Sequence, residues 1–413
     1  MKILQVLTYY RPHVSGLTIY VERLSKALVA QGHEVTVLTS QAEKEWPREE
    51  VKDGVRIVRV PVAFRISKGV IMPTLGLYAF KYVNWCDVLH LHLPQFDAPG
   101  FALRGKLLNK PTVLTYHCDL RLPDGLFNRM VDKVVLMMNR AAGALADAVV
   151  TYTRDYGQNS PYLSTYINRK LHIIPPPVEL AACSHTEAVD FYTKHELGDR
   201  PIVGIATRLA TEKGVEILLN ALPLVQQVFP NVQVLHAGQH ENVLGEEAYA
   251  ERLAPMFKRY ADSYKLLGNL HGAELTAFYK NLDVLVLCSL NSTESFGLVQ
   301  IEAMNNGVPC IASNLPGVRQ SVTMSGMGEI VPIGDYVALA DAIIRVLQDR
   351  ESYIKSSETI QATFEPAQTA REYLKLYAAL RDRTFNRSLP EPEPYQRLRA
   401  MRDEMKKKVI RKQ

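Results

Sequence analysis

Residues 283–313, DVLVLCSLNSTESFGLVQIEAMNNGVPCIAS, contain the pattern that decides the fold class. The stretch begins with a continuous apolar run, which is typical of a strand buried on both faces. A glycine-bearing loop follows, then a helical pattern from Gly297 to Asn306, and then a second apolar run that ends at Ser313. A buried strand, a helix and another buried strand form the repeating unit of a parallel sheet covered by helices.

The same alternation extends along the chain, before and after three consecutive prolines, Pro175–Pro177. The strand-like runs are KILQVLT, HEVTVLT, VRIVRVP, DVLHLH, PTVLTYH and ADAVVTY before the prolines, and PIVGIAT, VQVLHAG, DVLVLCS, VPCIAS and GEIVPI after them. We therefore predict an α/β protein with two Rossmann-like domains that face each other across an interdomain cleft.

A chain of 413 residues is too long for one hydrophobic core, and the stiff proline segment sets the expected boundary. The predicted domains are an N-terminal, acceptor-side domain over residues 1–176 and a C-terminal domain over residues 177–364. A helix within 365–390 is expected to pack back on the N-terminal domain. Residues 391–413 are expected to form a basic tail.

Charge and composition exclude several classes of protein. Residues 395–413 contain eight Lys or Arg and two acidic residues, a net of +6, whereas the whole chain carries +5. The body is thus nearly neutral, which argues against nucleic acid binding. The five cysteines show no metal-ligand spacing, and no apolar segment reaches the ~18 residues that span a membrane. Because the first residues read as a buried strand rather than a signal peptide, we expect a cytoplasmic protein.

Four residues occupy places where α/β sheets bind ligands, beyond the carboxyl ends of strands. Gly16 opens a helix after the first strand, and His117 ends the run PTVLTYH. Arg208 and Lys213 lie on a strand-to-helix turn, where two cations suit a diphosphate. The alternatives are a glycine that only eases a turn, a packed histidine and two solvated charges. The absence of a G-x-G-x-x-G sequence argues against a dinucleotide-dependent dehydrogenase.

Two glutamates flank the glycine-bearing loop of the opening stretch. Glu294 precedes the helix that starts at Gly297, and Glu302 lies one to two turns inside it among apolar neighbours. Their spacing is poor for a pair of cooperating acids. It favours two separate hydrogen-bonding roles on one elongated ligand, because a carboxylate accepts bonds well from vicinal hydroxyls of a sugar or a ribose. The alternative is a helix cap and a solvated side chain.

Taken in order, these segments resemble the retaining glycosyltransferases of family 4, also called glycosyl transferases group 1, which have the GT-B fold. The resemblance covers most of the chain, although Ser15 stands where the family usually has a first glycine. It rests on SGLTIYVERLSKALVAQGHEVTVLTS, TYH, TRLATEKGVEILLNAL, ESFGLVQIEAMNNGVPCIAS and NLPGV.

The resemblance implies transfer of a sugar from a UDP- or GDP-sugar to an acceptor hydroxyl with retention of configuration, in the synthesis of a glycolipid, a polysaccharide or another glycoconjugate. His117 and Glu294 are then the catalytic residues, contacting the donor sugar, and Glu302 holds the ribose. The implied donor-binding residues are Gly16, Arg208, Lys213, Ser295, Phe296, Gly297, Leu298 and Glu302. No cofactor and no essential metal is implied, because cations and helix amides stabilise the leaving diphosphate.

The acceptor is not specified by the sequence. In residues 119–146, Arg129, Lys133 and Arg140 share one helical face, and an apolar stripe formed by Leu126, Met130, Val134 and Met137 is interpreted as a core face. The basic face hints at a lipid-linked acceptor and a peripheral contact with the inner face of a membrane, with a solvated face as the alternative.

The tail carries a second apolar stripe, formed by Leu398, Met401, Met405 and Val409. A helix here would oppose this stripe with lysines and arginines, as membrane-surface helices do. The alternatives are a helix that packs on the first domain and a frayed end.

Two other classes of function remain open from the sequence. One is a nucleotide-sugar epimerase, a hydrolase or a sugar phosphorylase on the same fold. The other is a non-catalytic sensor of nucleotide sugars.

Overall fold

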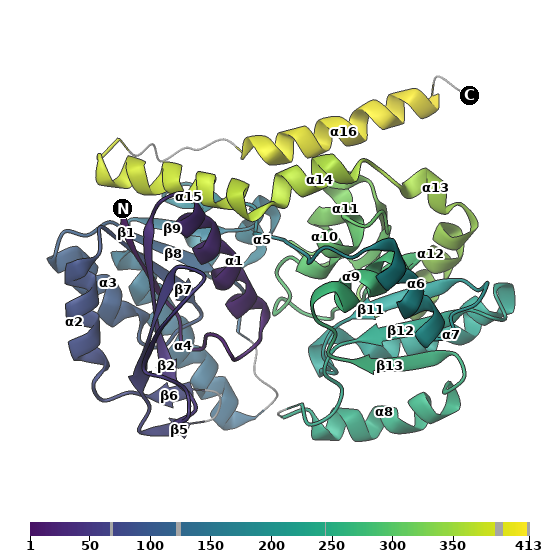
Figure 1. Ribbon diagram of the computed structural model, residues 1–413, viewed down its shortest axis with the longest axis horizontal. Coiled ribbons are helices and arrows are strands. Elements are labelled where there is room, and N and C mark those ends of the chain that lie inside the picture. Colours follow the sequence, from purple (N-terminus) through teal and green to yellow (C-terminus); the bar gives the residue numbers. More distant parts are fainter. Residues whose placement is uncertain (67–68, 121–124, 244, 385–390, 411–413) are drawn as a thin grey trace. The chain divides into compact units, whose positions relative to one another are not determined.

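The computed structural model describes residues 1–413 apart from 67–68, 121–124, 244, 385–390 and 411–413. The chain forms two compact units (Figure 1). The first comprises Met1–Pro177 and Phe364–Pro392, and the second comprises Val178–Thr363 and Glu393–Gln413. Each unit has its own sheet and its own hydrophobic core.

The sheet of the first unit has the strand order β10-β9-β8-β7-β1-β2-β4-β3. Its neighbours pair in parallel except for the antiparallel pair β3 and β4. The strands are β1 Lys2–Val6, β2 Glu34–Gln41, β3 Glu49–Lys52, β4 Val55–Pro61, β7 Val88–Leu93, β8 Thr112–Tyr116, β9 Ala148–Thr151 and β10 Leu171–Ile173, with a separate hairpin of β5 Phe64–Ile66 and β6 Gly69–Ile71. Strands β7 and β8 are buried along their whole length, as expected for strands covered on both faces.

Helices cover both faces of this sheet, as Figure 1 shows. They are α1 Gly16–Ala30, α2 Leu75–Trp85, α3 Ala98–Leu107, α4 Leu126–Leu145, α5 Arg154–Asn159, the 3-10 turn η1 Leu163–Tyr166 and α15 Pro366–Arg381. Helix α1 begins sharply because Ser15 caps it. The Ser15 hydroxyl accepts the Thr18 amide at 3.2 Å, and the Thr18 hydroxyl accepts the Ser15 amide at 2.7 Å.

The second unit has a parallel sheet in the order β13-β12-β11-β14-β15-β16. Its strands are β11 Ile202–Ala206, β12 Gln233–Ala237, β13 Tyr264–Gly268, β14 Val284–Leu287, β15 Cys310–Ser313 and β16 Gly328–Val331. This is the doubly wound order in which the winding reverses between the first and fourth strands, here β11 and β14.

The helices of the second unit include a packed pair, α7 and α12, and the short α10 that follows β14. Their bounds are α6 His185–Lys194, η2 Thr211–Lys213, α7 Val215–Val228, α8 Glu247–Arg259, α9 Gly272–Lys280, α10 Leu298–Met304, α11 Gln320–Ser325, α12 Tyr336–Gln348, α13 Arg350–Tyr353, α14 Ser357–Phe364 and α16 Glu393–Ile410. Helix α10 ends two residues before the expected Asn306, because Gly307, with φ of +74°, closes a tight turn into the next strand.

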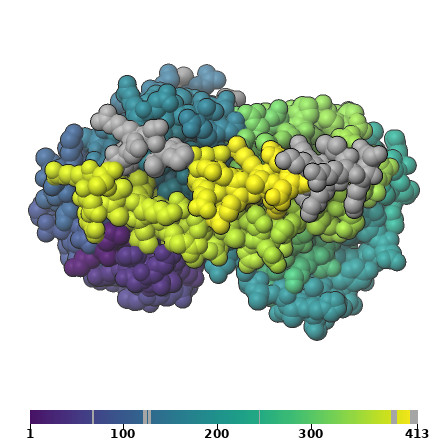
Figure 2. All heavy atoms as spheres, turned by 90° about the horizontal axis from the view of Figure 1, so that it is seen from above, coloured from purple at the N-terminus to yellow at the C-terminus, as the bar shows by residue number. Residues whose placement is uncertain are grey.

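The two C-terminal helices belong to different units. Helix α15 packs on α1 in the first unit, and the hydroxyl of its buried Tyr373 lies 2.7 Å from that of Tyr20. Helix α16, yellow in Figure 2, packs on α11 of the second unit. There Arg402 donates to the Thr323 carbonyl at 2.7 Å, and Leu398 is only 1% exposed.

The tail therefore differs from the alternatives considered for it. It packs on the second unit, and Leu398 of its apolar stripe is already buried inside the protein. Met401 is partly buried, and the side chains of Met405 and Val409 lie outside the described residues. The start of α16 is thus part of a folded core rather than a free membrane helix.

Replacing Leu398 with alanine should lower the free energy of unfolding of the second unit by about 2–5 kcal/mol, because the change leaves a cavity beneath α16. Urea unfolding followed by circular dichroism measures this effect. The exposed Glu404 on the same helix offers a matched control, and Glu404→Ala should stay within about 0.5 kcal/mol of the wild type. Equal stability of all three proteins would show that α16 does not pack as described.

Candidate functional site

The loops after β11 and β14 flank the point where the winding of the second sheet reverses. Ligands of open α/β sheets bind beyond the carboxyl ends of the strands at such a point. Arg208 and Lys213 follow β11, and the segment from Glu294 to Gly297 follows β14. The topology thus brings these sequence-predicted residues to one edge of the second sheet.

Lys213 and Glu294 form an ion pair across these two loops. The Lys213 ammonium donates to the Glu294 carboxylate at 2.6 Å, and the side chains are 18% and 17% exposed. The loops are also joined by backbone, since the Leu290 amide donates to the Glu212 carbonyl at 2.9 Å. The pair places a cation suited to phosphate directly beside a carboxylate suited to sugar hydroxyls.

Arg208 is the more exposed of the two predicted cations. Its guanidinium donates to Glu212 at 2.6 Å, while 43% of its side chain is exposed. Burial alone would raise the pKa of Glu212, but the charge of Arg208, a backbone hydrogen bond and the charge of Lys213 together bring the pKa below its ordinary value. The pair keeps Arg208 at the end of β11, where it stays accessible to an anionic ligand.

Gly297 gives the loop after β14 its sharp entry into α10. Its φ is +78°, and a Cβ there would lie 2.3 Å from the Leu287 Cδ2 atom, so only glycine fits. The side-chain amide of Gln300 holds the loop in place by donating from Nε2 to the Phe296 carbonyl at 2.9 Å and to the Val318 carbonyl at 3.0 Å. Gln300 is a supporting residue that the sequence pattern did not reveal.

Ser295, Phe296 and Leu298, expected to contact the donor, line the same turn. The side chain of Phe296 is buried in the core and Ser295 is also buried, whereas Leu298 is partly exposed. Any contact of Phe296 with a ligand is therefore made through its backbone, as the amide-based prediction requires. Direct contact with a donor remains a prediction for all three residues.

Glu302 is buried on α10 and held by a residue from another helix. The Tyr279 hydroxyl, at the end of α9, donates to the Glu302 carboxylate at 2.8 Å. This bond orients the Glu302 carboxylate within the second unit. Tyr279 could not be recognised from the sequence pattern, because an aromatic residue near a helix end usually only packs.

The two glutamates are expected to fail differently. Glu302→Gln should weaken binding of the bare nucleoside diphosphate, and Tyr279→Phe should weaken it severalfold by releasing Glu302. Glu294→Gln should leave that affinity nearly unchanged or slightly tighter, because Lys213 loses a competing carboxylate, and should lower turnover. Titration calorimetry and turnover measurements separate the two effects. Equal loss of nucleotide affinity in both glutamate variants would refute these separate roles.

His117 is buried at the end of β8 in the first unit, inside a hydrogen-bonded chain. Its Nε2 lies 2.9 Å from His92 Nδ1, and its Nδ1 is hydrogen-bonded to the Tyr152 hydroxyl. Burial lowers the pKa of His117 to about 3, so the ring is neutral at neutral pH. Both ring nitrogens thus have protein partners, as in the packed-histidine alternative. The predicted contact with sugar stays a prediction.

Gln5 determines which groups donate and which accept in this series of hydrogen bonds. Its Oε1 accepts from His92 Nε2 at 2.6 Å, so the neutral His92 carries its proton on Nε2. His92 Nδ1 must then accept from His117 Nε2, and His117 Nδ1 accepts from Tyr152. The alternation of His90 and His92 in the strand VLHLHL was the available signal, since residues two apart share one face of a strand.

Gly16 begins α1 and is exposed. A Cβ added at Gly16 would meet no atom within 4 Å, so the fold of the first unit does not itself require glycine here. Ser15, which replaces the family's usual first glycine, serves as the helix cap instead. A close approach of ligand to the backbone of Gly16 remains a prediction.

Two family models match this chain in sequence. Residues 191–363 match the glycosyl transferases group 1, and residues 15–176 match the glycosyl transferase 4-like domain. The chain belongs to the glycosyl transferases of group 1. Each match lies within one of the two units, and the match over residues 191–363 contains the switch-point residues described above.

Relatives of this glycosyltransferase cover nearly its whole length. The phosphatidyl-myo-inositol mannosyltransferase of Mycobacterium leprae is 25% identical over 389 residues, which is 91% of this chain and 96% of the relative. The D-inositol 3-phosphate glycosyltransferase of Xylanimonas cellulosilytica is 27% identical, covering 81% and 84%.

Solved structures show that this glycosyltransferase has the GT-B fold. Sucrose-phosphate synthase from Thermosynechococcus elongatus matches with a TM-score of 0.73 and 24% identity, covering 92% of this chain and 98% of that one. Anabaena HepE in complex with UDP matches with a TM-score of 0.70 and 18% identity, covering 92% and 100%. In the described part of the glycosyltransferase, no helix is long and apolar enough to cross a membrane.

Proposed function

We propose that this glycosyltransferase moves a sugar from a nucleotide-diphosphate sugar, with UDP or GDP as the leaving group, to an acceptor hydroxyl with retention of the anomeric configuration. The observation that carries the proposal is the Lys213–Glu294 pair at the switch point of the second sheet. It sets a phosphate-binding cation beside a sugar-binding carboxylate, as the junction between diphosphate and sugar requires. The structures of HepE with UDP and with glucose support a donor of this class.

The chemistry follows from where charge develops. As the bond between the sugar and the diphosphate breaks, negative charge grows on the phosphate and positive charge on the sugar ring. Lys213 and Arg208 stabilise the phosphate, together with the amides around Gly297. The Glu294 carboxylate, displaced from Lys213 by phosphate oxygens, accepts hydrogen bonds from sugar hydroxyls. The acceptor oxygen enters from the face that the diphosphate leaves, and the diphosphate takes the acceptor's proton.

His117 acts in this scheme as a neutral dipole. Its low pKa, caused by burial, excludes a protonated imidazole acid at neutral pH. The neutral ring is held in the hydrogen-bonded chain of Gln5, His92, His117 and Tyr152. We propose that this chain orders the groups that polarise a hydroxyl of the sugar. Activity should accordingly show no inflection from this residue between pH 5 and 8.

The acceptor hydroxyl is proposed to belong to a lipid. The mycobacterial relatives are named for phosphatidyl-myo-inositol, and the Xylanimonas relative for an inositol phosphate. Both names point to a polyol that carries a phosphate. A cytoplasmic enzyme in peripheral contact with the inner face of a membrane would meet such an acceptor.

Screening nucleotide sugars by thermal shift tests the donor proposal. A true donor present at ~100 times its dissociation constant adds about 2.7 kcal/mol to stability. One UDP- or GDP-sugar should raise the melting temperature more than its free sugar does. Product analysis then separates the alternatives: an epimerase changes the donor without any acceptor, a hydrolase releases free sugar, and a phosphorylase requires inorganic phosphate. A sensor binds the donor and yields no product.

Activity should persist in EDTA. Cations and backbone amides are proposed to stabilise the leaving diphosphate, and no cluster of metal-ligating side chains is found within the described residues. This mechanism predicts that turnover with excess EDTA and turnover without it agree within about twofold. Loss of activity that only Mg²⁺ or Mn²⁺ restores would contradict it.

A further inference from the structure

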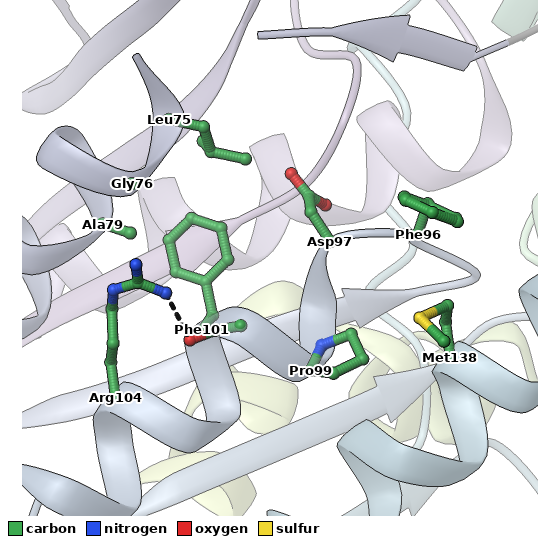
Figure 3. A pocket seen from close by; sticks show the side chains of 10 residues that line it. Leu75, Gly76, Ala79, Phe96, Asp97, Pro99, Phe101, Arg104 and Met138 are labelled. Atoms are coloured by element: carbon green, nitrogen blue, oxygen red, sulfur yellow. Dashed lines mark hydrogen bonds between the residues drawn. The ribbon is translucent and has the colours of Figure 1, made fainter. Parts of the chain in front are cut away.

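A pocket of about 220 Å³ opens between α2 and α3 in the first unit, beside the loop that follows the carboxyl end of β7 (Figure 3). Its walls are largely apolar and come from three helices and the loop before α3. The lining side chains include Leu75, Ala79, Phe96, Phe101, Arg104 and Met138, together with one carboxylate, Asp97. Arg104 is the cation among them, and its guanidinium donates to the Gly100 carbonyl at 2.8 Å.

Large apolar side chains are exposed on the three helices that line this pocket. On α2 and α3, Leu77 and Leu107 are each 75% exposed, and Phe80 and Leu103 are also exposed. On α4, Met130, Val134 and Met137 of the stripe interpreted as a core face are exposed too, whereas the side chain of Leu126 lies outside the described residues. That interpretation was wrong because helical spacing shows that a face is apolar and not what covers it.

The same three helices are strongly cationic. Lys81, Arg104, Lys106, Arg129, Lys133 and Arg140 lie on them, against one acidic residue, Asp132. Exposed apolar side chains among lysines and arginines are the features of surfaces that lie on anionic bilayers. A soluble partner protein would more often meet an apolar centre with a polar rim, whereas here the charges are interspersed.

We propose that the pocket between α2 and α3 binds one acyl chain of an anionic lipid, with the surrounding face of α2, α3 and α4 lying on the membrane. The apolar walls take the chain, and Arg104 takes the negatively charged headgroup. Only one part of this proposal rests on the proposed function, namely that the bound lipid is the acceptor or lies beside it in the membrane. The binding itself needs neither donor sugar nor turnover.

Two glycines keep the pocket open. Gly76 and Gly100 line it, and a Cβ at either would meet only the flexible end of Arg104, at 3.4 and 3.3 Å respectively. Both lie in helices, where glycine is a weaker helix former than leucine. Leucine at either position therefore fills the pocket while favouring the helix, which separates loss of binding from loss of folding.

Titration calorimetry of the full chain with n-alkyl phosphates, kept below their aggregation concentrations, tests the pocket. Affinity should rise about fourfold for each added methylene and then level off once the chain fills the pocket. Gly76→Leu and Gly100→Leu should each weaken decyl phosphate binding at least tenfold. Asn84→Leu adds the same side chain at an exposed position of α2 and should leave binding unchanged.

The opposite results overturn the proposal. Affinity that keeps rising with chain length, or that survives Gly76→Leu, would mean adsorption to the surface outside the pocket. Equal binding of decyl phosphate and uncharged decyl maltoside would show that the pocket does not recognise an anionic headgroup. An unchanged ratio of their affinities in Arg104→Gln would show the same. If inorganic phosphate bound as tightly as decyl phosphate, the pocket would not bind the acyl chain.

Flotation with phosphatidylglycerol vesicles tests the surrounding face. The wild type should float with these vesicles and not with phosphatidylcholine vesicles, and added salt should release it. Leu77→Ser with Leu107→Ser should reduce flotation severalfold while leaving binding of the nucleoside diphosphate unchanged. Undiminished flotation of this double variant would show that the face does not contact the bilayer. If flotation succeeds but no donor is bound, the proposed function fails and this inference stands.

Discussion

Replacing Lys213 with alanine is expected to weaken binding of the nucleoside diphosphate by about ten- to a hundredfold. Charge-assisted hydrogen bonds are worth roughly 1.5–3 kcal/mol, and Lys213 is the better buried of the two cations at the switch point. The substitution also leaves the Glu294 carboxylate without its ammonium partner, beside the phosphate. Titration calorimetry with UDP and GDP measures the loss.

A matched control exists in the same unit. Lys194 pairs with Glu274 at 2.7 Å on the surface, between α6 and α9 and not on the loops after β11 and β14. Lys194→Ala should leave diphosphate affinity unchanged, and Lys213→Arg should retain most of it because the charge is kept. Unaltered affinity in Lys213→Ala, with the fold intact by circular dichroism, would exclude Lys213 from the phosphate site.

Acid should destabilise the first unit steeply below pH 6.5. Burial lowers the pKa of His117 to about 3 and that of His172 to about 4, and burial lowers the pKa of His90 and His92 well below the ordinary value. These groups are neutral when folded and take up protons near pH 6.5 when unfolded. Their stabilisation is therefore complete above about pH 6.5 and is lost as the pH falls towards the folded values.

The expected loss reaches up to about 5 kcal/mol per pH unit if the four groups act independently, at about 1.4 kcal/mol each. Urea unfolding followed by tryptophan fluorescence measures it, because both tryptophans, Trp46 and Trp85, lie in the first unit. His172→Leu should reduce the slope by about one quarter, whereas replacing the exposed His185 should not. A stability that stays flat from pH 7.5 to 5 would contradict the buried neutral histidines.

The doubly wound sheets could be predicted from the sequence because buried parallel strands read as continuous apolar runs. Those runs also identify the loops at the strand ends. The positions of Arg208, Lys213 and Glu294 in these loops could therefore be predicted from the sequence. The ion pair between Lys213 and Glu294 could not be predicted, since it joins side chains 81 residues apart through the β11–β14 switch point.

The features that could not be predicted from the sequence depend on which side chains pack against one another in the folded protein. A histidine at the end of a strand can face a ligand or the core, and only the positions of Gln5, His92 and Tyr152 show that both nitrogens of His117 are engaged. The stripe on α4 and the stripe on α16 have similar helical spacing. One is exposed and the other begins with the buried Leu398, because tertiary packing determines which apolar face finds a partner.

Acceptor-dependent transfer from a nucleotide sugar is the most direct test of the central claim. The purified enzyme is incubated with the donor that gives the largest thermal shift, with anionic lipids as acceptors, and the products are analysed by mass spectrometry and by the anomeric coupling of the new linkage. We expect one nucleoside diphosphate released for each glycosylated lipid, with the donor's anomeric configuration retained and with both products lost in Lys213→Ala. Donor consumption that does not depend on the acceptor, or a linkage of inverted configuration, would contradict a retaining glycosyltransferase.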